Sequence, residues 1–247
     1  MTDHAIVSRD QWLEARKALL AREKEETRLR DAVNAQRLAL PWVRVDKDYR
    51  FATHDGEKSL ADLFDGRSQL IIYHFMLAPG WGAGCPGCSF LSDHIDGALP
   101  HLTHHDVTWV AVSRAPIDEI AAYKARMGWR FPWVSSSASS FNYDFGVSFT
   151  AEQLASGKIM FDYQETDSTG LSTEQPGLSA FHKDADGAIY HTYSSYSRGL
   201  EQVLGTLMIL DRAPLGRNER STMDFVRRHD EYEDKLASGC CHAAAAE

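Results

Sequence analysis

The sequence lacks several features that would place it in a large functional class. Its 247 residues contain no apolar run that approaches the roughly 18 residues needed by a membrane-spanning helix. Positive charge is not in excess, because the formal net charge is −9, and this argues against nucleic acid or a membrane surface as the main partner. The chain has no Gly-x-Ser-x-Gly motif and no phosphate-binding loop, so hydrolase and nucleotide-dependent functions lack support and no cofactor is expected.

Cysteine is also scarce. Four cysteines in a chain of this length are too few for a secreted scaffold held together by disulfides. The first residues turn charged at once and lack the apolar core of a secretory signal, so we expect a cytoplasmic protein. The cysteines occur in two pairs, Cys85 with Cys88 and Cys240 with Cys241, and in a reducing compartment such grouping favours catalysis or metal binding.

The pattern along the chain predicts three parts. Ser8 and Gln11 have the spacing of a capping box, which predicts a charged helix from residue 8 to about residue 38. We expect a helical arm over residues 1–40, either solvated and laid across the domain or forming the contact of a homodimer. An α/β domain is expected over residues 41–215, and a C-terminal helix with a flexible tail over residues 216–247.

The α/β domain is predicted from alternating apolar runs and amphipathic segments. Nearly continuous apolar runs at 70–77, 107–113 and 131–136 are typical of strands covered on both faces. An Asp-Gly turn at 186–187 predicts a late hairpin, whereas the polar segment 148–175 receives no assignment. The strand order predicts a three-layer α/β sandwich with a mixed central sheet. Helices are expected at about 85–100, 116–128 and 198–213.

The motif GCPGCSF places Cys85 and Cys88 after a buried strand and at the start of a helix. The unpaired N–H groups of a first helical turn stabilise a thiolate, and Pro86 suits the first helical position, where no N–H is needed. We expect Cys85 to face solvent as the nucleophile and Cys88, one turn later, to face inward and resolve the mixed disulfide.

Zinc binding and simple packing are the two alternatives to a redox role for the cysteine pair. The pair could be half of a zinc site, for which Cys240, Cys241 and His242 could supply further ligands. It could also consist of small buried side chains without chemistry.

Pro176 strengthens the redox interpretation. In a thioredoxin-type layout, a proline with a cis peptide bond precedes the strand that begins the final hairpin, and Pro176 occupies that place. We expect Pro176 to pack beside the cysteine pair and the backbone near Gln175 to pair with an extended substrate. The alternative is a trans proline that ends the preceding loop.

Several blocks of the sequence resemble a bacterial family of unknown function. The blocks are GCPGCSF, DVTWVAVSRAP, YKARMGWRFPWVSS, FNYDFGVSFT and RRHDEYE, and the resemblance extends over about residues 8–235. Members of this family are described as predicted dithiol-disulfide oxidoreductases with a thioredoxin-like fold. The resemblance implies that fold here, in a peroxiredoxin-like variant, and a redox pair at Cys85 and Cys88.

The chain departs from thioredoxins proper at two places. Trp81 stands four positions before Cys85 instead of directly before it, and the usual buried aspartate of the preceding strand is missing. His74 is the nearest ionisable residue in that strand. A hydrogen-bonded core histidine is favoured there over a proton acceptor for Cys88.

Two blocks are similar to those of peroxiredoxin-like relatives, which bind peroxide with a cysteine near a threonine and an arginine. The corresponding candidates here are Arg114 and Thr150. No threonine stands directly before Cys85, so peroxide reduction is the lesser alternative.

Two further groups favour ordinary structural roles. His101, His104 and His105 could bind a metal, but a solvated loop accounts for them better. Trp129, Phe131 and Trp133 alternate as core residues of a strand do, and a substrate platform is the minor alternative.

Taken together, the sequence predicts a thiol-disulfide oxidoreductase that needs no metal or cofactor. Its substrate is a protein or small-molecule disulfide or thiol, and its reductant is an unidentified thiol. The alternatives are a thiol peroxidase and a non-catalytic protein that senses redox state or holds a metal. A shuttle role for Cys240 and Cys241 is a further hypothesis. The predicted site consists of Cys85 and Cys88 for catalysis and Trp81, Pro86, Gln175 and Pro176 for substrate binding.

Overall fold

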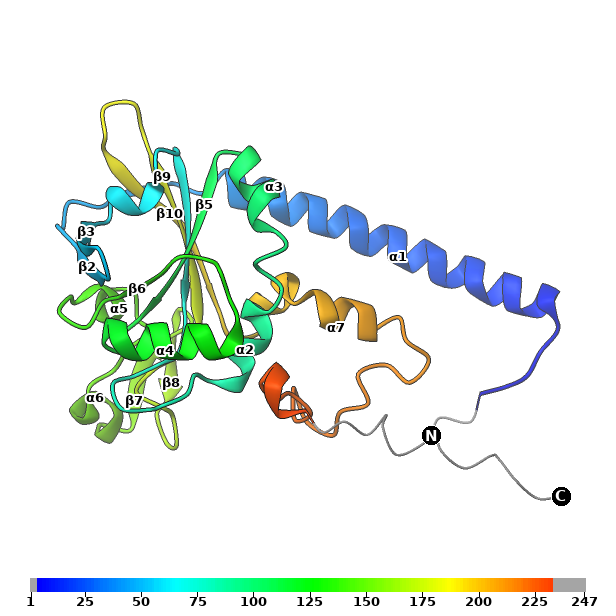
Figure 1. The fold of residues 1–247 in the computed structure, drawn as a ribbon. Coiled ribbons are helices and arrows are strands. Elements are labelled where there is room, and N and C mark those ends of the chain that lie inside the picture. Colours follow the sequence, from blue (N-terminus) through cyan, green and yellow to red (C-terminus); the bar gives the residue numbers. More distant parts are fainter. Residues whose placement is uncertain (1–3, 233–247) are drawn as a thin grey trace, which may run out of the picture.

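An eight-stranded mixed sheet forms the centre of the molecule (Figure 1). The computed structural model describes residues 4–232. The strand order is β1-β10-β9-β4-β5-β6-β2-β3, in which β4, β5 and β6 run parallel and β9 is antiparallel to both β4 and β10. The strands of this sheet are β1 Val43–Arg44, β2 Arg50–Thr53, β3 Gly56–Ser59, β4 Gln69–His74, β5 Val107–Ser113, β6 Trp133–Ser135, β9 Gly177–Lys183 and β10 Ile189–Tyr196.

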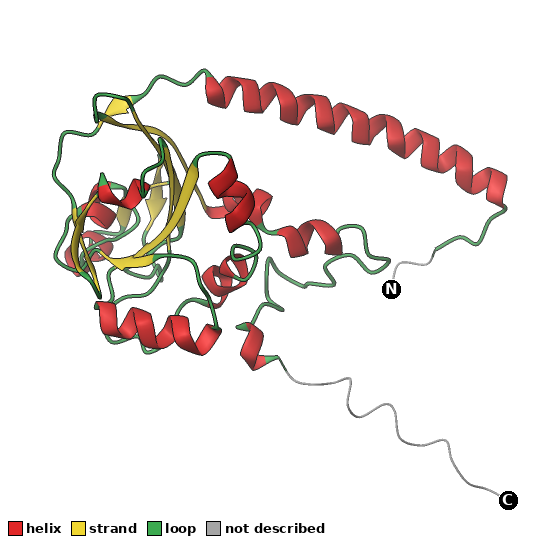
Figure 2. Cartoon of the chain, turned by 45° about the horizontal axis from the view of Figure 1, so that its top comes forward, coloured by secondary structure: helices red, strands yellow, loops and turns green. Residues whose placement is uncertain are grey.

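Helical elements lie on both faces of the sheet (Figures 1 and 2). The α-helices are α1 Arg9–Leu38, α2 Pro86–Ser92, α3 Leu99–His104, α4 Ile117–Met127, α5 Phe141–Asp144, α6 Ala151–Ala155 and α7 Gly205–Leu210. The 3-10 helices are η1 Asp62–Phe64, η2 Ser197–Val203 and η3 His229–Glu231.

Two apolar clusters form the core, one on each face of the sheet. The first cluster joins α2, α4, η2 and α7 to the sheet and includes Tyr73, Phe75 and Cys88. The second cluster lies under η1 and α5 and includes Ile72 and Phe141. Because neighbouring residues of β4 belong to different clusters, this strand is covered on both faces, as its continuous apolar run predicts.

The predicted three-layer sandwich with a mixed sheet is therefore confirmed. The central strand β4 is followed by the cysteine turn, the parallel strands β5 and β6 follow on one side of it and are reached through helices, and the hairpin β9–β10 lies on its other side. This is the thioredoxin-like arrangement that the sequence implies.

Two of the predicted helices are interrupted. The segment expected as one helix at 85–100 is α2 and α3 with turns between them, because carboxylates there bind a neighbouring loop: Asp93 accepts a hydrogen bond from Trp129 Nε1 at 2.8 Å, and Asp96 accepts one from the Phe131 N–H at 3.0 Å. The segment expected as a helix at 198–213 is η2 and α7. His94 accepts the backbone N–H of Thr206 at 3.0 Å and so starts a new helix there.

The polar segment 148–175 forms a small unit of its own. It contains α6 and a separate two-stranded sheet, made of β7 Lys158–Phe161 and β8 Gln164–Asp167. A third apolar cluster, which includes Val147, Phe161 and Tyr196, attaches this unit to the end of β10.

The predicted C-terminal helix is absent from the described part of residues 216–247. Residues 216–232 contain turns and the short η3, and they pack over α2: Val226 belongs to the first cluster, and Phe225 contacts the edge of Phe90. Cys240, Cys241 and His242, and with them the predicted shuttle and zinc ligands, lie outside the described residues.

The long helix α1 projects away from the sheet instead of lying across it (Figure 2). Ser8 and Gln11 form the predicted capping box, and no residue of the helix is buried. Trp12, Leu19 and Leu29 are among its exposed apolar side chains. In the described part of the chain, no helix combines the length and the apolar character needed to cross a membrane.

Removal of residues 1–34 should leave the domain folded. Since α1 buries nothing, we expect its loss to shift the melting temperature by no more than about 2 °C, the effect of changing surface residues only. Thermal unfolding followed by circular dichroism measures this shift, and light scattering of both proteins shows whether the arm holds a homodimer together. A large loss of stability at an unchanged mass would contradict the solvated arm.

Candidate functional site

Cys85 and Cys88 lie where β4 ends and α2 begins. The backbone N–H of Cys85 bonds to Met76 O at 3.2 Å, which ties the turn to the end of the strand. Cys85 is the N-cap residue of α2 and Pro86 is its first helical residue, as expected from the missing N–H of proline. Ser89 closes the turn, because its N–H and its hydroxyl donate to Cys85 O at 3.0 and 2.9 Å. Both thiols are free.

Gly84 allows the turn to lie flat on the core. A Cβ atom at this position would lie 2.7 Å from Tyr123 Cε1 and closer still to Phe75, and both rings are buried. The carbonyl of Gly84 accepts two hydrogen bonds from Arg228, from Nε at 2.9 Å and from Nη2 at 2.6 Å. The residue before Cys85 is therefore packed against the core on one side and bonded to the C-terminal segment on the other.

The surroundings of Cys85 favour a thiolate. The hydrogen bond from the Cys88 thiol lowers the pKa of Cys85 most, and the backbone N–H groups of Gly87 and Cys88 and the charge of Arg228 lower it further. These effects outweigh burial, which acts in the opposite direction, and bring the pKa of Cys85 to about 6. Cys85 is therefore largely ionised at neutral pH.

Cys88 has the opposite environment. Its side chain is buried, and burial is the main reason that its pKa is raised well above the usual value. Its sulfur accepts the Met76 N–H at 3.4 Å and also has a hydrogen bond with the buried Tyr73 hydroxyl. The proton therefore stays on Cys88 while Cys85 carries the charge.

His74 lies on the other face of β4 and does not meet the cysteines. It is buried against Phe141 and Phe145, and its Nε2 is 2.9 Å from Ser179 Oγ. Burial lowers the pKa of His74 to about 3, so the ring is neutral. The favoured prediction of a hydrogen-bonded core histidine is confirmed.

A cavity of about 250 Å³ opens beside the two sulfurs. Pro176 lies in its wall, as predicted, but its peptide bond is trans: residues 4–232 contain no cis bond. The expectation of a cis proline is wrong, and the alternative of a trans proline that ends the preceding loop holds, with β9 beginning directly after it.

Gln175 and Trp81, which the sequence predicts to bind substrate, lie outside the lining of this cavity. The Gln175 N–H already donates to Val147 O at 2.8 Å, so it is not available to an extended substrate. Trp81 is 38% exposed and is not among the residues that line the cysteine cavity.

The residues considered for peroxide or metal binding are also placed elsewhere. Arg114 donates from Nε to the buried carboxylate of Glu174 at 2.7 Å, and Thr150 caps α6; neither lines the cavity at Cys85. The three histidines of 101–105 lie at the end of α3, and the described residues contain no cluster suited to a metal ion. Trp129, Phe131 and Trp133 are core residues of the first cluster, as predicted.

Sequence reasoning missed two residues of the site. Tyr73 could have been found from strand alternation, since it shares a face with Phe75 and that face meets the helix carrying the cysteines. Arg228 has no local signal for this role, because 144 positions separate it from Gly84.

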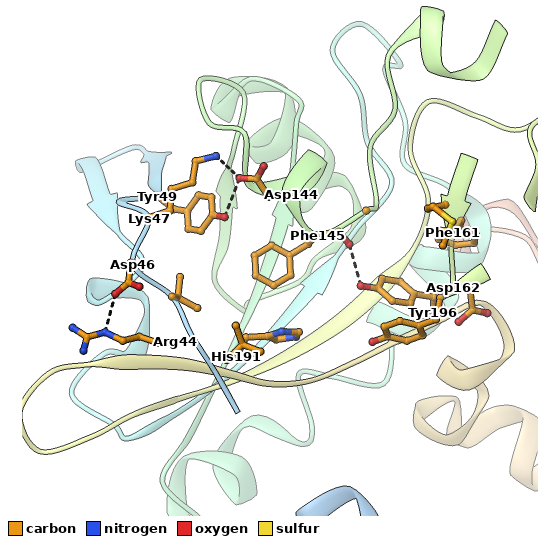
Figure 3. Close-up of a pocket in the computed structure, with 15 residues that line it drawn as sticks. Arg44, Asp46, Lys47, Tyr49, Asp144, Phe145, Phe161, Asp162, His191 and Tyr196 are labelled. Carbon is orange, nitrogen blue, oxygen red and sulfur yellow. Dashed lines mark hydrogen bonds and ion pairs between the residues drawn. The ribbon is translucent and has the colours of Figure 1, made fainter. Parts of the chain in front are cut away.

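A larger cavity of about 510 Å³ lies away from the cysteines, between β1, the end of α5, the β7–β8 turn and β10 (Figure 3). Its main charged groups pair with each other: Lys47 bonds Asp144 at 2.6 Å, and Arg44 bonds Asp46 at 2.8 Å. It contains no nucleophile comparable to a thiolate, so the smaller cavity is the candidate active site.

Comparisons with known proteins place the chain in a family. A family model described as "Bacterial protein of unknown function (DUF899)" matches residues 1–232. The chain belongs to this family. A search of curated proteins finds no match.

Solved structures with a similar fold include peroxiredoxins. Peroxidoxin BcpB from Mycobacterium tuberculosis is 15% identical, with 69% of this chain and 97% of that chain covered and a TM-score of 0.43. Peroxiredoxin Q from Xanthomonas campestris is 14% identical, with 65% and 89% covered and the same TM-score of 0.43. At these values the likeness says nothing about the reaction of this DUF899 protein.

The acidity of Cys85 can be measured by alkylation. The rate of Cys85 alkylation should rise with pH through a midpoint near 6, because only the thiolate reacts. Arg228→Met should move the midpoint upward and slow the reaction at pH 6 by about threefold, since a partly screened charge contributes up to about 1 kcal/mol. Peptide mass spectrometry distinguishes Cys85 from Cys88.

Arg227→Met is the matched control, because Arg227 donates to Asp224 O and Val226 O and not to the cysteine turn. The control should keep the midpoint of the native protein. An unchanged midpoint in Arg228→Met would show that this charge does not act on Cys85.

Proposed function

We propose that this protein is a thiol-disulfide oxidoreductase in which Cys85 attacks a substrate disulfide and Cys88 resolves the intermediate. One observation carries the proposal: two free thiols one helical turn apart have opposite acidities, with an acidic, partly exposed Cys85 and a buried, protonated Cys88. This division suits a two-step exchange, because the first step needs a thiolate and the second needs a thiol that does not react first.

In the first step the Cys85 thiolate attacks one sulfur of the disulfide. A bond forms between Cys85 Sγ and that sulfur, and the other half of the substrate leaves as a thiolate. In the second step the Cys88 proton passes to the thiolate released in the first step, and Cys88 attacks Cys85 Sγ; the bond between Cys85 and the substrate sulfur breaks, and the second half of the substrate leaves as a thiolate. Two cysteines are oxidised and one disulfide is reduced; an external thiol then restores the pair.

Two neighbours support the second step. The Met76 N–H and the Tyr73 hydroxyl both bond the Cys88 sulfur, where they stabilise negative charge as the proton leaves. The main groups that act on Cys88 in the described part of the chain include no carboxylate, and these two donors take the place of the buried aspartate that β4 lacks. A cytoplasmic, reducing environment is the setting that would keep the pair in its dithiol form.

Substitution of the resolving thiol should trap the intermediate. When reduced Cys88→Ser is mixed with bis(2-hydroxyethyl) disulfide, we expect one stable mercaptoethanol adduct on Cys85, whereas the native protein should form the Cys85–Cys88 disulfide and release two thiols. Mass spectrometry of the intact protein and its peptides measures both products.

Cys85→Ser is the control and should give no adduct at this turn. The proposed function is wrong if the native protein keeps its adduct or never forms the internal disulfide.

Loss of the Tyr73 hydroxyl should slow resolution specifically. In Tyr73→Phe we expect the first thiol to be released at the native rate and the second about tenfold more slowly, because one hydrogen bond to a developing thiolate is lost. Stopped-flow detection of released thiol separates the two phases.

Tyr49→Phe is the matched control, since Tyr49 is also buried and bonds Asp144 at 2.9 Å, far from Cys88 in the second cluster. It should leave both phases unchanged. If both variants slow the second phase equally, the slowing comes from a general loss of protein stability and not from the Tyr73 hydroxyl.

A further inference from the structure

The cavity beside Cys85 and Cys88 is small and apolar. Its walls are formed mainly by Leu91, Leu200 and Leu204, the Tyr73 ring, Pro176 and Met223. Its volume of about 250 Å³ lies below the roughly 300–1,000 Å³ of pockets that hold drug-sized ligands. Buried apolar walls favour an apolar group, because polar groups lose their hydration there without replacement.

The charged residues at the rim do not favour an ionic substrate. Arg198 and Glu201 are the charged residues that line the cavity, and they pair with each other at 2.9 Å. Arg217 adds a second contact to Glu201 at 3.4 Å. The carboxylates of a peptide disulfide would therefore find no free cation among these groups.

The backbone near the cysteines offers few free groups to a protein substrate that would dock by strand addition. The Gln175 N–H is bonded to Val147, and β9 is paired with β4 on one side and β10 on the other from Gly177 onward. Thr222 and Met223 of the C-terminal segment lie over the cavity as part of its lining. Among the described residues, no free strand edge is present at the cysteines.

We propose that this cavity binds one alkyl group of a small apolar organic disulfide, so that the adjacent sulfur is presented to Cys85. This inference rests on the proposed function and specifies its substrate class. Cys85 displaces the first alkyl thiolate, Cys88 displaces the second, and an added dithiol such as dithiothreitol reduces the Cys85–Cys88 disulfide for the next turnover. The net reaction converts one dialkyl disulfide and one dithiol into two alkyl thiols and a cyclic disulfide.

The substrate class can be tested with the full-length protein and a series of disulfides. With dithiothreitol as reductant, we expect kcat/KM for dipropyl disulfide to exceed that for oxidised glutathione and for insulin by at least about tenfold, after subtraction of the uncatalysed rate, because the cavity buries the apolar propyl group and, among its described residues, offers no free partner to charged groups. Cumene hydroperoxide is included as a non-disulfide substrate.

Two variants alter the size of the cavity. Leu200→Phe fills it and should lower kcat/KM for dipropyl disulfide about tenfold, while the pH midpoint of Cys85 alkylation stays near 6. Val203→Phe is the matched control, because Val203 lies in the same 3-10 helix, is exposed and does not line the cavity. Met223→Ala widens the cavity and should raise the rate with dipentyl disulfide relative to dipropyl disulfide.

The outcomes separate this inference from the proposed function. If the native protein reduces oxidised glutathione or insulin as well as dipropyl disulfide, the function stands and the apolar subsite is wrong. If Val203→Phe and Leu200→Phe behave alike, the subsite is also wrong. Turnover of cumene hydroperoxide alone, or no turnover at all, would overturn the function itself.

Discussion

The register of the central strand β4 determines the chemistry of the site. This strand is hydrogen-bonded on both sides and covered on both faces, so its side chains alternate strictly between the two core clusters. The alternation places Tyr73 against Cys88 and His74 against Phe141. A shift by one residue would exchange them and put an imidazole beside the thiols. The pairing of β4 with β5 and β9 therefore makes a phenol, which stays protonated, the neighbour of Cys88.

The opposite acidities of the two thiols arise from one shared hydrogen bond and from unequal burial. Cys88 donates to Cys85, which lowers the pKa of the acceptor and keeps the proton on the buried donor. The turn also directs backbone N–H groups at the exposed sulfur, and Gly84 lets it lie close enough to Phe75 for this geometry. When a disulfide forms, both the negative charge near Arg228 and the hydrogen bond between the thiols disappear, so oxidation removes the interactions that set the acidity of Cys85.

Local sequence patterns predicted the parts of the fold that depend on interactions between residues close together in the chain. The apolar run of β4, the capping box at Ser8 and the alternating row from Trp129 to Trp133 depend on periodicity and capping, which a sequence displays directly. The interrupted helices could not be predicted in this way, because the bonds that end them come from distant loops, as Asp93 to Trp129 shows. The cis form of Pro176 was predicted from the analogy with thioredoxins alone. The peptide bond before Pro176 is trans.

The contribution of the C-terminal segment to the candidate site could not be predicted from local sequence patterns. Arg228 reaches the Gly84 carbonyl, and Met223 lies over the cavity, although both follow a predicted domain boundary at residue 215. A boundary there would separate the thiolate from one of the charges that stabilise it and would open the cavity to water. Exposed apolar walls and a solvated thiolate would both weaken the proposed selection of an apolar substrate, so the candidate site includes the chain at least to Arg228. The candidate site is therefore assembled from four segments, the β4–α2 turn, the loop at Pro176, η2 with the residues up to Leu204, and the C-terminal segment, and only the first has a motif of its own.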